Sequence, residues 1–152
     1  MFRTGAGVQS ANRIILVSEA DGDGDGVAEQ REIFLEGLNS PFGMTLIGNT
    51  LYGANTDAIL AFPYQTGETF ITAEGELIAR LSAGPINHHW TKNVIASADG
   101  TKLYATVGSN SNMAENGVKV EENRSAVLEI DLAKRQTRAF ASGLRNPNGL
   151  AW

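Results

Sequence analysis

The sequence predicts an all-β protein, more specifically a partial β-propeller of about two full four-stranded blades. Two observations lead to this fold class: short strand-like runs recur along the chain, and one junction motif between them repeats. Seventeen glycines among 152 residues supply many positions suited to tight turns. The runs are rich in β-branched and aromatic residues, and none carries a convincing helical period.

The expected strands follow one another in order, each bounded by Gly, Asn, Asp or Pro. They cover residues 13–19, 32–38, 42–47, 50–54, 58–64 and 76–81, then 93–97, 102–107, 126–132 and 137–142, with a further strand starting at 149–152. Residues 1–12 show no strand pattern and are assigned to a disordered or truncated N-terminal segment. The propeller domain is therefore expected to span residues 13–152.

The repeated junction marks the step from one blade to the next. Residues 37–44 (GLNSPFGM) return as residues 143–150 (GLRNPNGL), and residues 83–90 (AGPINHHW) are a degenerate copy. This spacing predicts whole blades at 41–83 and 87–142, outer strands of a preceding blade at 13–38 and the inner strand of a following one at 147–152. A β-sandwich also has many short strands but does not predict the junctions. An end inside a strand leaves a ladder unpaired, so we expect a fragment of a larger, six-bladed protein.

Composition excludes several classes of function. Hydrophobic residues make up 42% and charged residues 19% of the chain, which is ordinary for a globular domain. The net charge of −5 and the absence of a basic cluster argue against nucleic-acid binding. The chain has no cysteine, which removes disulfides and thiolate metal sites. No run approaches the roughly 20 apolar residues of a membrane span, and residues 1–11 lack the apolar region of a secretion signal.

An acidic loop near the N-terminus matches the calcium pattern D-x-[DN]-x-[DN]-G-x₅-E. Its expected ligands are the carboxylates of Asp21, Asp23, Asp25 and Glu32 and the backbone carbonyl of Val27. The flanking runs look like strands, so an EF-type loop set in a β-hairpin is expected, most simply in a structural role. An Asp/Gly-rich turn that binds no metal is the alternative, because both residue types favour turns.

His88 and His89 are the only histidines and the first candidates for catalysis. Adjacent residues of a strand point to opposite faces, so at most one of them is expected to face the channel. The pair lies at the start of an innermost strand, the end of a propeller where ligands bind. At the equivalent place in the next junction, Arg145 offers a planar fork of donors suited to carboxylates, and Asn146 follows it. The alternative for Arg145 is an ordinary salt bridge between blades.

Three runs resemble the quinoprotein glucose/sorbosone dehydrogenase family, especially its L-sorbosone dehydrogenase-like branch. They are residues 143–152 (GLRNPNGLAW), 87–108 (NHHWTKNVIASADGTKLYATVG) and 21–29 (DGDGDGVAE) followed by 34–44 (FLEGLNSPFGM). The resemblance implies a six-bladed propeller that holds pyrroloquinoline quinone (PQQ) and calcium. It also implies oxidation of an aldose or sorbosone-type sugar at C1, with a histidine base and hydride transfer to the quinone.

The resemblance also implies roles for single residues. His88 matches the base best, because Lys92 stands four positions later where the family has a basic residue; His89 is the alternative if the strand register shifts by one. Arg145 and Asn146 match contacts to the quinone's carboxylates and carbonyls, and Lys92 and Ser109 are expected at the same cofactor site. The family's supporting Asp is replaced by Ser109, a neutral partner for imidazolium.

The resemblance implies a sugar substrate, an electron acceptor such as a cytochrome or a quinone, and a periplasmic or secreted location. Because Ser109 is neutral, the alternative function is a non-catalytic, calcium-binding propeller for carbohydrate binding or protein interaction. A lactonase-type propeller is not favoured, since no cluster of inward acidic ligands is evident.

We predict that the acidic loop binds calcium in the range of about 10⁻⁴–10⁻³ M, as extracellular modules commonly do. Asp23→Ala should weaken binding, because it removes one of the converging carboxylates. Isothermal titration calorimetry measures both. An absence of calcium heat at millimolar metal, or an unchanged affinity in the variant, contradicts the prediction.

Overall fold

The computed structural model describes residues 10–19 and 23–152, and its regular structure is almost entirely β-sheet. Ten strands form three antiparallel sheets, and the only helical element in the described part is a 3₁₀ turn, η1 (Val118–Glu121). No helix among these residues is long and apolar enough to cross a membrane. The predicted all-β, partial-propeller fold class is confirmed.

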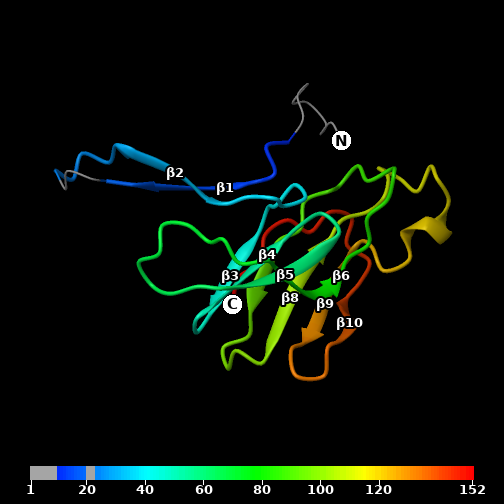
Figure 1. Ribbon diagram of the computed structural model, residues 1–152. Helices are drawn as coiled ribbons and strands as arrows, with labels where there is room; N and C mark the ends of the chain where they lie inside the picture. Colours follow the sequence, from blue (N-terminus) through cyan, green and yellow to red (C-terminus); the bar gives the residue numbers. More distant parts are fainter. Residues whose placement is uncertain (1–9, 20–22) are drawn as a thin grey trace.

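Two of the sheets are four-stranded meanders in which sequence neighbours pair. The first consists of β3 (Met44–Ile47), β4 (Thr50–Ala54), β5 (Ala58–Pro63) and β6 (Glu76–Arg80); the second consists of β7 (Val94–Ala96), β8 (Lys102–Val107), β9 (Ala126–Asp131) and β10 (Gln136–Ala141). Each sheet lies inside one of the spans expected to form a blade. The third sheet is a ribbon of β1 (Ile14–Ser18) and β2 (Gln30–Leu35) that extends away from the other two (Figure 1).

Local sequence explains how the meanders turn. β3 and β4 pair Ile47 with Thr50, which leaves only Gly48 and Asn49 in the hairpin turn. Gly48 has a φ of 56°, a left-handed conformation that glycine adopts without steric cost. In the central strands β8 and β9, residues of both faces are buried, as in a strand covered on each side.

An apolar seam joins the two meanders face to face. Ile59 and Ala54 from the first sheet pack with Leu103, Val107 and Ile130 from the second, and all five are fully buried. A second cluster lies on the opposite face of the first sheet. There Phe34 and Leu35 of the ribbon, with Leu38 just after it, pack against Leu51 and Phe62 of the sheet and Ile71 of the loop between β5 and β6. The order in space is therefore ribbon, first meander, second meander, as expected for successive blades.

One expected strand is not formed. Within the described residues, 147–152 join no sheet, although residues 149–152 were predicted to begin a strand. The segment instead reaches over the second meander, where the Trp152 indole N–H donates to the Ala96 carbonyl at 2.7 Å. Its ring packs edge-on against Tyr104, with centroids 5.1 Å apart.

A charged network lies on the face of the second meander that points away from the first. Glu129 on β9 accepts two hydrogen bonds from Arg138, one from Lys102 and one from the Tyr104 hydroxyl, at 2.8–3.1 Å. These hydrogen bonds lower the pKa of Glu129 from 4.5 to about 2, and those from Arg138 have the largest effect. The ionised carboxylate thus ties β8, β9 and β10 together.

Glu129→Gln should lower the free energy of unfolding at neutral pH. Because the folded pKa lies below the ordinary value, the carboxylate's contribution is complete above pH 4.5 and is lost as pH falls toward 2. The variant should therefore show a smaller loss of stability across that interval, measured by urea unfolding at a series of pH values. Glu76→Gln, in an exposed pair with Arg135, is the control and should change little. Parallel pH curves for wild type and Glu129→Gln would exclude this role.

The first meander approaches the second so closely at Gly43 that a side chain has no room. A Cβ there would lie 2.6 Å from the Asn93 side-chain oxygen and 2.7 Å from the Val94 nitrogen. Gly43→Ala should therefore cost about 1–3 kcal/mol of unfolding free energy by overpacking. Gly149→Ala, at the equivalent position of the next junction, meets open space and is the matched control. Equal unfolding midpoints in urea for the two variants would refute the close approach.

Candidate functional site

The three junction segments meet at the start of β3 and β7, two strands that lie next to each other. The Gly43 N–H donates to the Lys92 carbonyl at 3.0 Å, which links the first junction to the second. The Asn93 amide and the Thr91 hydroxyl donate to the Asn148 backbone and side-chain oxygens, which links the second to the third. The repeated motif of the sequence therefore forms one contiguous site in space.

The His89 side chain is hydrogen-bonded to Ser109, which lies two residues after the end of β8. Its Nδ1 lies 2.7 Å from the Ser109 hydroxyl and 3.2 Å from the Ser109 carbonyl. The Ser109 hydroxyl already donates its hydrogen to the Ser111 carbonyl at 2.6 Å, so it can only accept from the histidine. Both contacts at Nδ1 require an N–H there. In the neutral ring the lone pair is then on Nε2, the atom able to accept a proton.

His88 and Lys92 occupy different surroundings from those the family resemblance implies. The His88 side chain is exposed, and its backbone N–H donates to the Asn110 carbonyl at 3.1 Å. Ser109, expected beside the base, thus contacts His89 and not His88. Lys92 is fully buried, and its ammonium group donates to the Trp90 carbonyl at 3.1 Å. In this structure Lys92 supports the histidine segment from inside the protein.

Arg145 and Asn146 border the histidine from the third junction. The Arg145 backbone carbonyl accepts from the Ser109 N–H at 2.9 Å, and its guanidinium donates to the Asn112 carbonyl and side-chain oxygen at 2.9 and 2.6 Å. All three contacts are hydrogen bonds between blades. The two to Asn112 use two of the five N–H groups of the Arg145 guanidinium. The Asn146 side-chain oxygen is the one buried side-chain polar atom in the described structure without a hydrogen-bond partner.

Gly108 makes the closeness of His89 and Asn146 possible. A Cβ at Gly108 would collide with the His89 Cβ and lie 2.6 Å from the Asn146 side-chain oxygen. Any larger residue would separate the two side chains. The glycine that ends β8 is therefore part of the site's shape, which the sequence indicated only as a strand-ending glycine.

A buried relay that sequence reasoning missed holds the histidine segment on both sides. The Arg124 guanidinium donates to the Asn87 side-chain oxygen at 2.8 Å, the Asn87 amide donates to the Thr56 hydroxyl at 3.0 Å, and that hydroxyl donates to the Trp90 carbonyl at 3.2 Å. Arginine can only donate, so it sets the direction of every bond in the chain. Burial lowers the pKa of Arg124, an effect opposed by the Glu121 carboxylate. Arg124 looked like an ordinary loop residue, since nothing in its local sequence signals burial.

The acidic loop is only partly described. Asp21 lies outside the described residues, whereas Asp23 and Asp25 are exposed and their carboxylates accept backbone N–H bonds from Asp25 and Val27 at 2.9 and 2.7 Å. Glu32 lies on β2, paired with Leu16. Among residues 10–19 and 23–152, no three acidic or histidine side chains converge as metal ligands. Calcium binding here stays a prediction.

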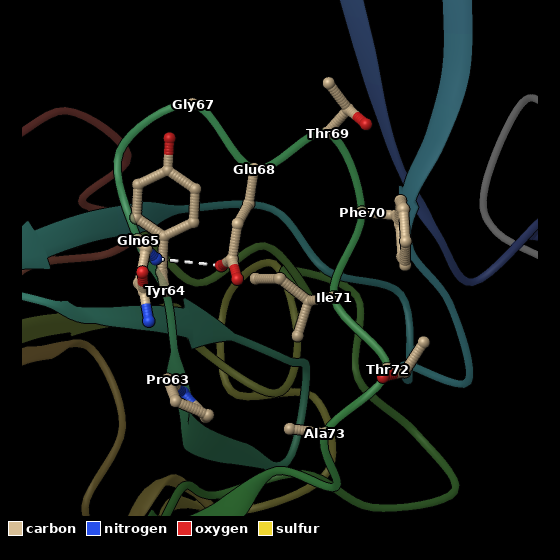
Figure 2. Close-up of a pocket in the computed structure, with 10 residues that line it drawn as sticks. All are labelled: Pro63, Tyr64, Gln65, Gly67, Glu68, Thr69, Phe70, Ile71, Thr72 and Ala73. Atoms are coloured by element: carbon tan, nitrogen blue, oxygen red, sulfur yellow. Dashed lines mark hydrogen bonds between the residues drawn. The ribbon is translucent and has the colours of Figure 1, made fainter.

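A hollow of about 390 Å³ lies at the end of β5 that is far from the junctions. Figure 2 shows the loop from Pro63 to Ala73 curling around it, with Ile71 in its centre. The Glu68 carboxylate closes the loop by accepting from the Gln65 N–H at 2.8 Å. The turn that precedes β5 touches the junctions through Thr56, so a strand length separates this hollow from His89. It takes no part in the site.

The geometry around His89 can abstract a proton. One ring nitrogen is fixed by hydrogen bonds, the other carries a lone pair, and the half-buried His89 lies across Gly108 from the unpaired Asn146 amide oxygen. Such an arrangement suits general-base catalysis on a hydroxyl group.

Solved structures with a similar fold come from two fungi. One is the holo form of the pyranose dehydrogenase PQQ domain from Coprinopsis cinerea, with a TM-score of 0.63 and 18% identity, covering 82% of this chain and 33% of that one. Another is the calcium structure of the carbohydrate-active enzyme family AA12 of Trichoderma reesei, with a TM-score of 0.58 and 14% identity, covering 80% and 29%. At such identities the likeness is one of fold, and this chain spans about a third of their length.

No curated protein matches the sequence. The TrAA12-like family model, in contrast, matches residues 8–152, nearly the whole chain. The sequence resemblance pointed to the sorbosone dehydrogenase-like branch, whereas the family that matches is the TrAA12-like one. Family match, propeller fold and converging junctions agree, and this chain belongs to the TrAA12-like family.

Proposed function

We propose that the chain is part of a quinoprotein sugar dehydrogenase, with PQQ as cofactor and His89 as general base. The observation that carries the proposal is the pair of hydrogen bonds between His89 Nδ1 and Ser109, which leaves Nε2 as the basic atom. Two further facts support it: the TrAA12-like family match, and the fold shared with a PQQ domain of pyranose dehydrogenase.

The residues at the junctions fit one side of such a cofactor. PQQ is a planar, anionic ring system rich in carboxylates and carbonyl oxygens, which calls for fixed donors. The exposed Arg145 guanidinium keeps three N–H groups beyond the two that contact Asn112, and the Asn146 amide lies next to it. The buried Lys92 adds positive charge behind the same segment. We assign Arg145 and Asn146 as cofactor contacts and Lys92 and Ser109 as supports.

The chain's own part in the reaction is to orient the sugar and to move one proton. His89 Nε2 accepts the proton of the C1 hydroxyl, and the resulting imidazolium is stabilised by the Ser109 hydroxyl and carbonyl oxygens at Nδ1. A serine stabilises positive charge less than a carboxylate does, so the base acts without a charged partner at this position. The quinone, when bound, supplies the acceptor for the hydride that leaves C1.

The remaining parts of the proposal extend beyond this chain. The substrate is an aldose or sorbosone-type sugar, the electron acceptor is a cytochrome or a quinone, and the whole protein acts in the periplasm or outside the cell. Calcium belongs to the proposal through the acidic loop, and a structurally similar AA12 protein is known in a calcium structure. Because the chain spans a third of its structural relatives, further cofactor contacts would come from outside it.

One observation favours a second candidate, a non-catalytic carbohydrate-binding or protein-binding propeller. Ser109 occupies the place of the acid that supports the histidine in related quinoproteins, and a neutral residue there weakens the base. In this reading the histidines shape a binding surface, and no turnover is expected.

We predict that His89→Ala lowers kcat by about 10²-fold or more in the full-length protein loaded with PQQ and calcium, the usual scale for a lost general base. His88→Ala is the adjacent control and should retain most activity, since its side chain is exposed and Ser109 contacts its neighbour. In the cofactor-free chain, ¹⁵N NMR should show the signal of one histidine ring protonated at Nδ1, and this signal should be missing from the spectrum of His89→Ala. The assignment is simple because the chain has only two histidines. The reverse order of activity loss would make His88 the base, and no loss in either variant would support the binding module.

A further inference from the structure

We propose that a hollow beside the histidine segment is a binding subsite for a neutral sugar ring. The hollow has a volume of about 350 Å³ and lies between residues 82–86 and the loop of residues 110–124. This volume is at the small end of ligand pockets and suits a single monosaccharide. The choice of a sugar as the ligand rests on the proposed function. What is new is the place where the ring binds and the preference for an uncharged sugar over a sugar acid.

Arg124 forms the polar floor of the hollow. Its side chain is only 7% exposed, yet among the described residues it makes one hydrogen bond, to Asn87. The other four N–H groups of the guanidinium are available to a ligand in the hollow that Arg124 lines. Sugar hydroxyl oxygens are acceptors of the right kind. Asn116, whose amide donates to the Asn110 side-chain oxygen at 2.8 Å, presents its own carbonyl oxygen as an acceptor for hydroxyl hydrogens.

Charge favours a neutral ligand over an acidic one. The Glu121 carboxylate acts on Arg124 electrostatically and already opposes its positive charge. Glu122, exposed, lines the same hollow and adds a further negative charge. A sugar acid would meet the Glu122 carboxylate, and the positive charge of Arg124 is already partly balanced by Glu121 behind the lining. An uncharged polyol instead uses Glu122 as an acceptor and Arg124 as a donor.

Part of the lining is apolar, as the carbon–hydrogen face of a pyranose requires. Pro85, Ile86 and Val120 line the hollow, with Ile86 45% and Val120 44% exposed. Apolar side chains next to a few fixed polar groups are the usual composition of a small-ligand site. The mixed apolar and polar lining therefore matches the two kinds of surface on a sugar ring.

Hydrogen bonds within the protein hold the loop that forms one wall of the hollow. Glu121 accepts from the Asn110 and Ser111 N–H groups and from the Ser111 hydroxyl, at 2.7–3.2 Å, which fixes one wall of the loop. Arg145 holds the same loop at Asn112. Such preorganisation reduces the entropy lost on binding.

The hollow borders the proposed catalytic segment directly. Asn110 lines it, and its carbonyl accepts from the His88 N–H while its amide donates to the Ile86 carbonyl at 2.6 Å. Arg124, in its floor, directs the relay that supports Asn87 and Trp90 on either side of the histidines. A sugar in the hollow thus lies next to the segment that carries His89.

The test is a titration of the cofactor-free chain with methyl β-D-glucopyranoside and with the corresponding methyl glucuronoside, followed by ¹H–¹⁵N NMR shifts. Val120→Trp fills the hollow from η1, and Val118→Trp is the matched control, on the same 3₁₀ turn but 79% exposed and outside the lining. Both sites are on the surface, so both variants should fold, as circular dichroism can verify.

We expect the neutral glycoside to bind in the millimolar range and to shift amides of residues 82–86 and 116–124. The glucuronoside and the Val120→Trp variant should each bind about tenfold more weakly, while Val118→Trp should match wild type. No binding of the neutral glycoside, tighter binding of the glucuronoside, or full binding by Val120→Trp overturns the subsite. In the loaded full-length protein, a His89-dependent activity whose KM is unchanged by Val120→Trp would reject the subsite and keep the proposed function.

Discussion

The apolar seam between the two meanders is the constraint on which the rest of the structure depends. Ile59 from one sheet and Leu103 and Ile130 from the other are fully buried in it, and removing such residues from water is the main favourable contribution to folding. The seam fixes the two sheets face to face. It thereby determines that β3 and β7 start side by side, and that the junctions before them touch.

At that end of the sheets the apolar seam gives way to a polar one. Thr56 from the first meander, Asn87 from the junction and Arg124 from the second meander form one buried chain of hydrogen bonds across the same boundary. A buried network of polar groups costs little folding free energy when its members are hydrogen-bonded to one another. Removing one member costs much more, because its partner is then left unpaired. The relay therefore both closes the seam and holds the histidine segment in one register.

Ser109 shows how a single neutral residue alters the chemistry of this site. Its hydroxyl donates to Ser111 and so can only accept from His89, which selects the ring tautomer without supplying a negative charge. A carboxylate in its place would select the same tautomer and also stabilise the imidazolium. Ser109 thus orients the His89 ring without placing a negative charge beside it.

The sequence by itself determined the strands and their order, because strand periodicity and turn residues are local signals. The ends of β4 and β8 agree with the sequence prediction, and most other ends differ by one or two residues, since fraying and pairing at a strand end depend on its neighbours. The repeated junctions likewise indicated successive blades. A strand at 149–152 was not formed, because a strand needs a partner, and local pattern does not supply one.

Only the tertiary structure decided which residues meet. The family resemblance favoured His88 through Lys92, yet the approach of β8 places Ser109 against His89 and encloses Lys92 inside the protein. Arg124 is buried by residues far away in the chain, so no local pattern could mark it. Periodicity tells which face of a strand a residue occupies, but what lies opposite that face is set by the packing of one sheet on the next.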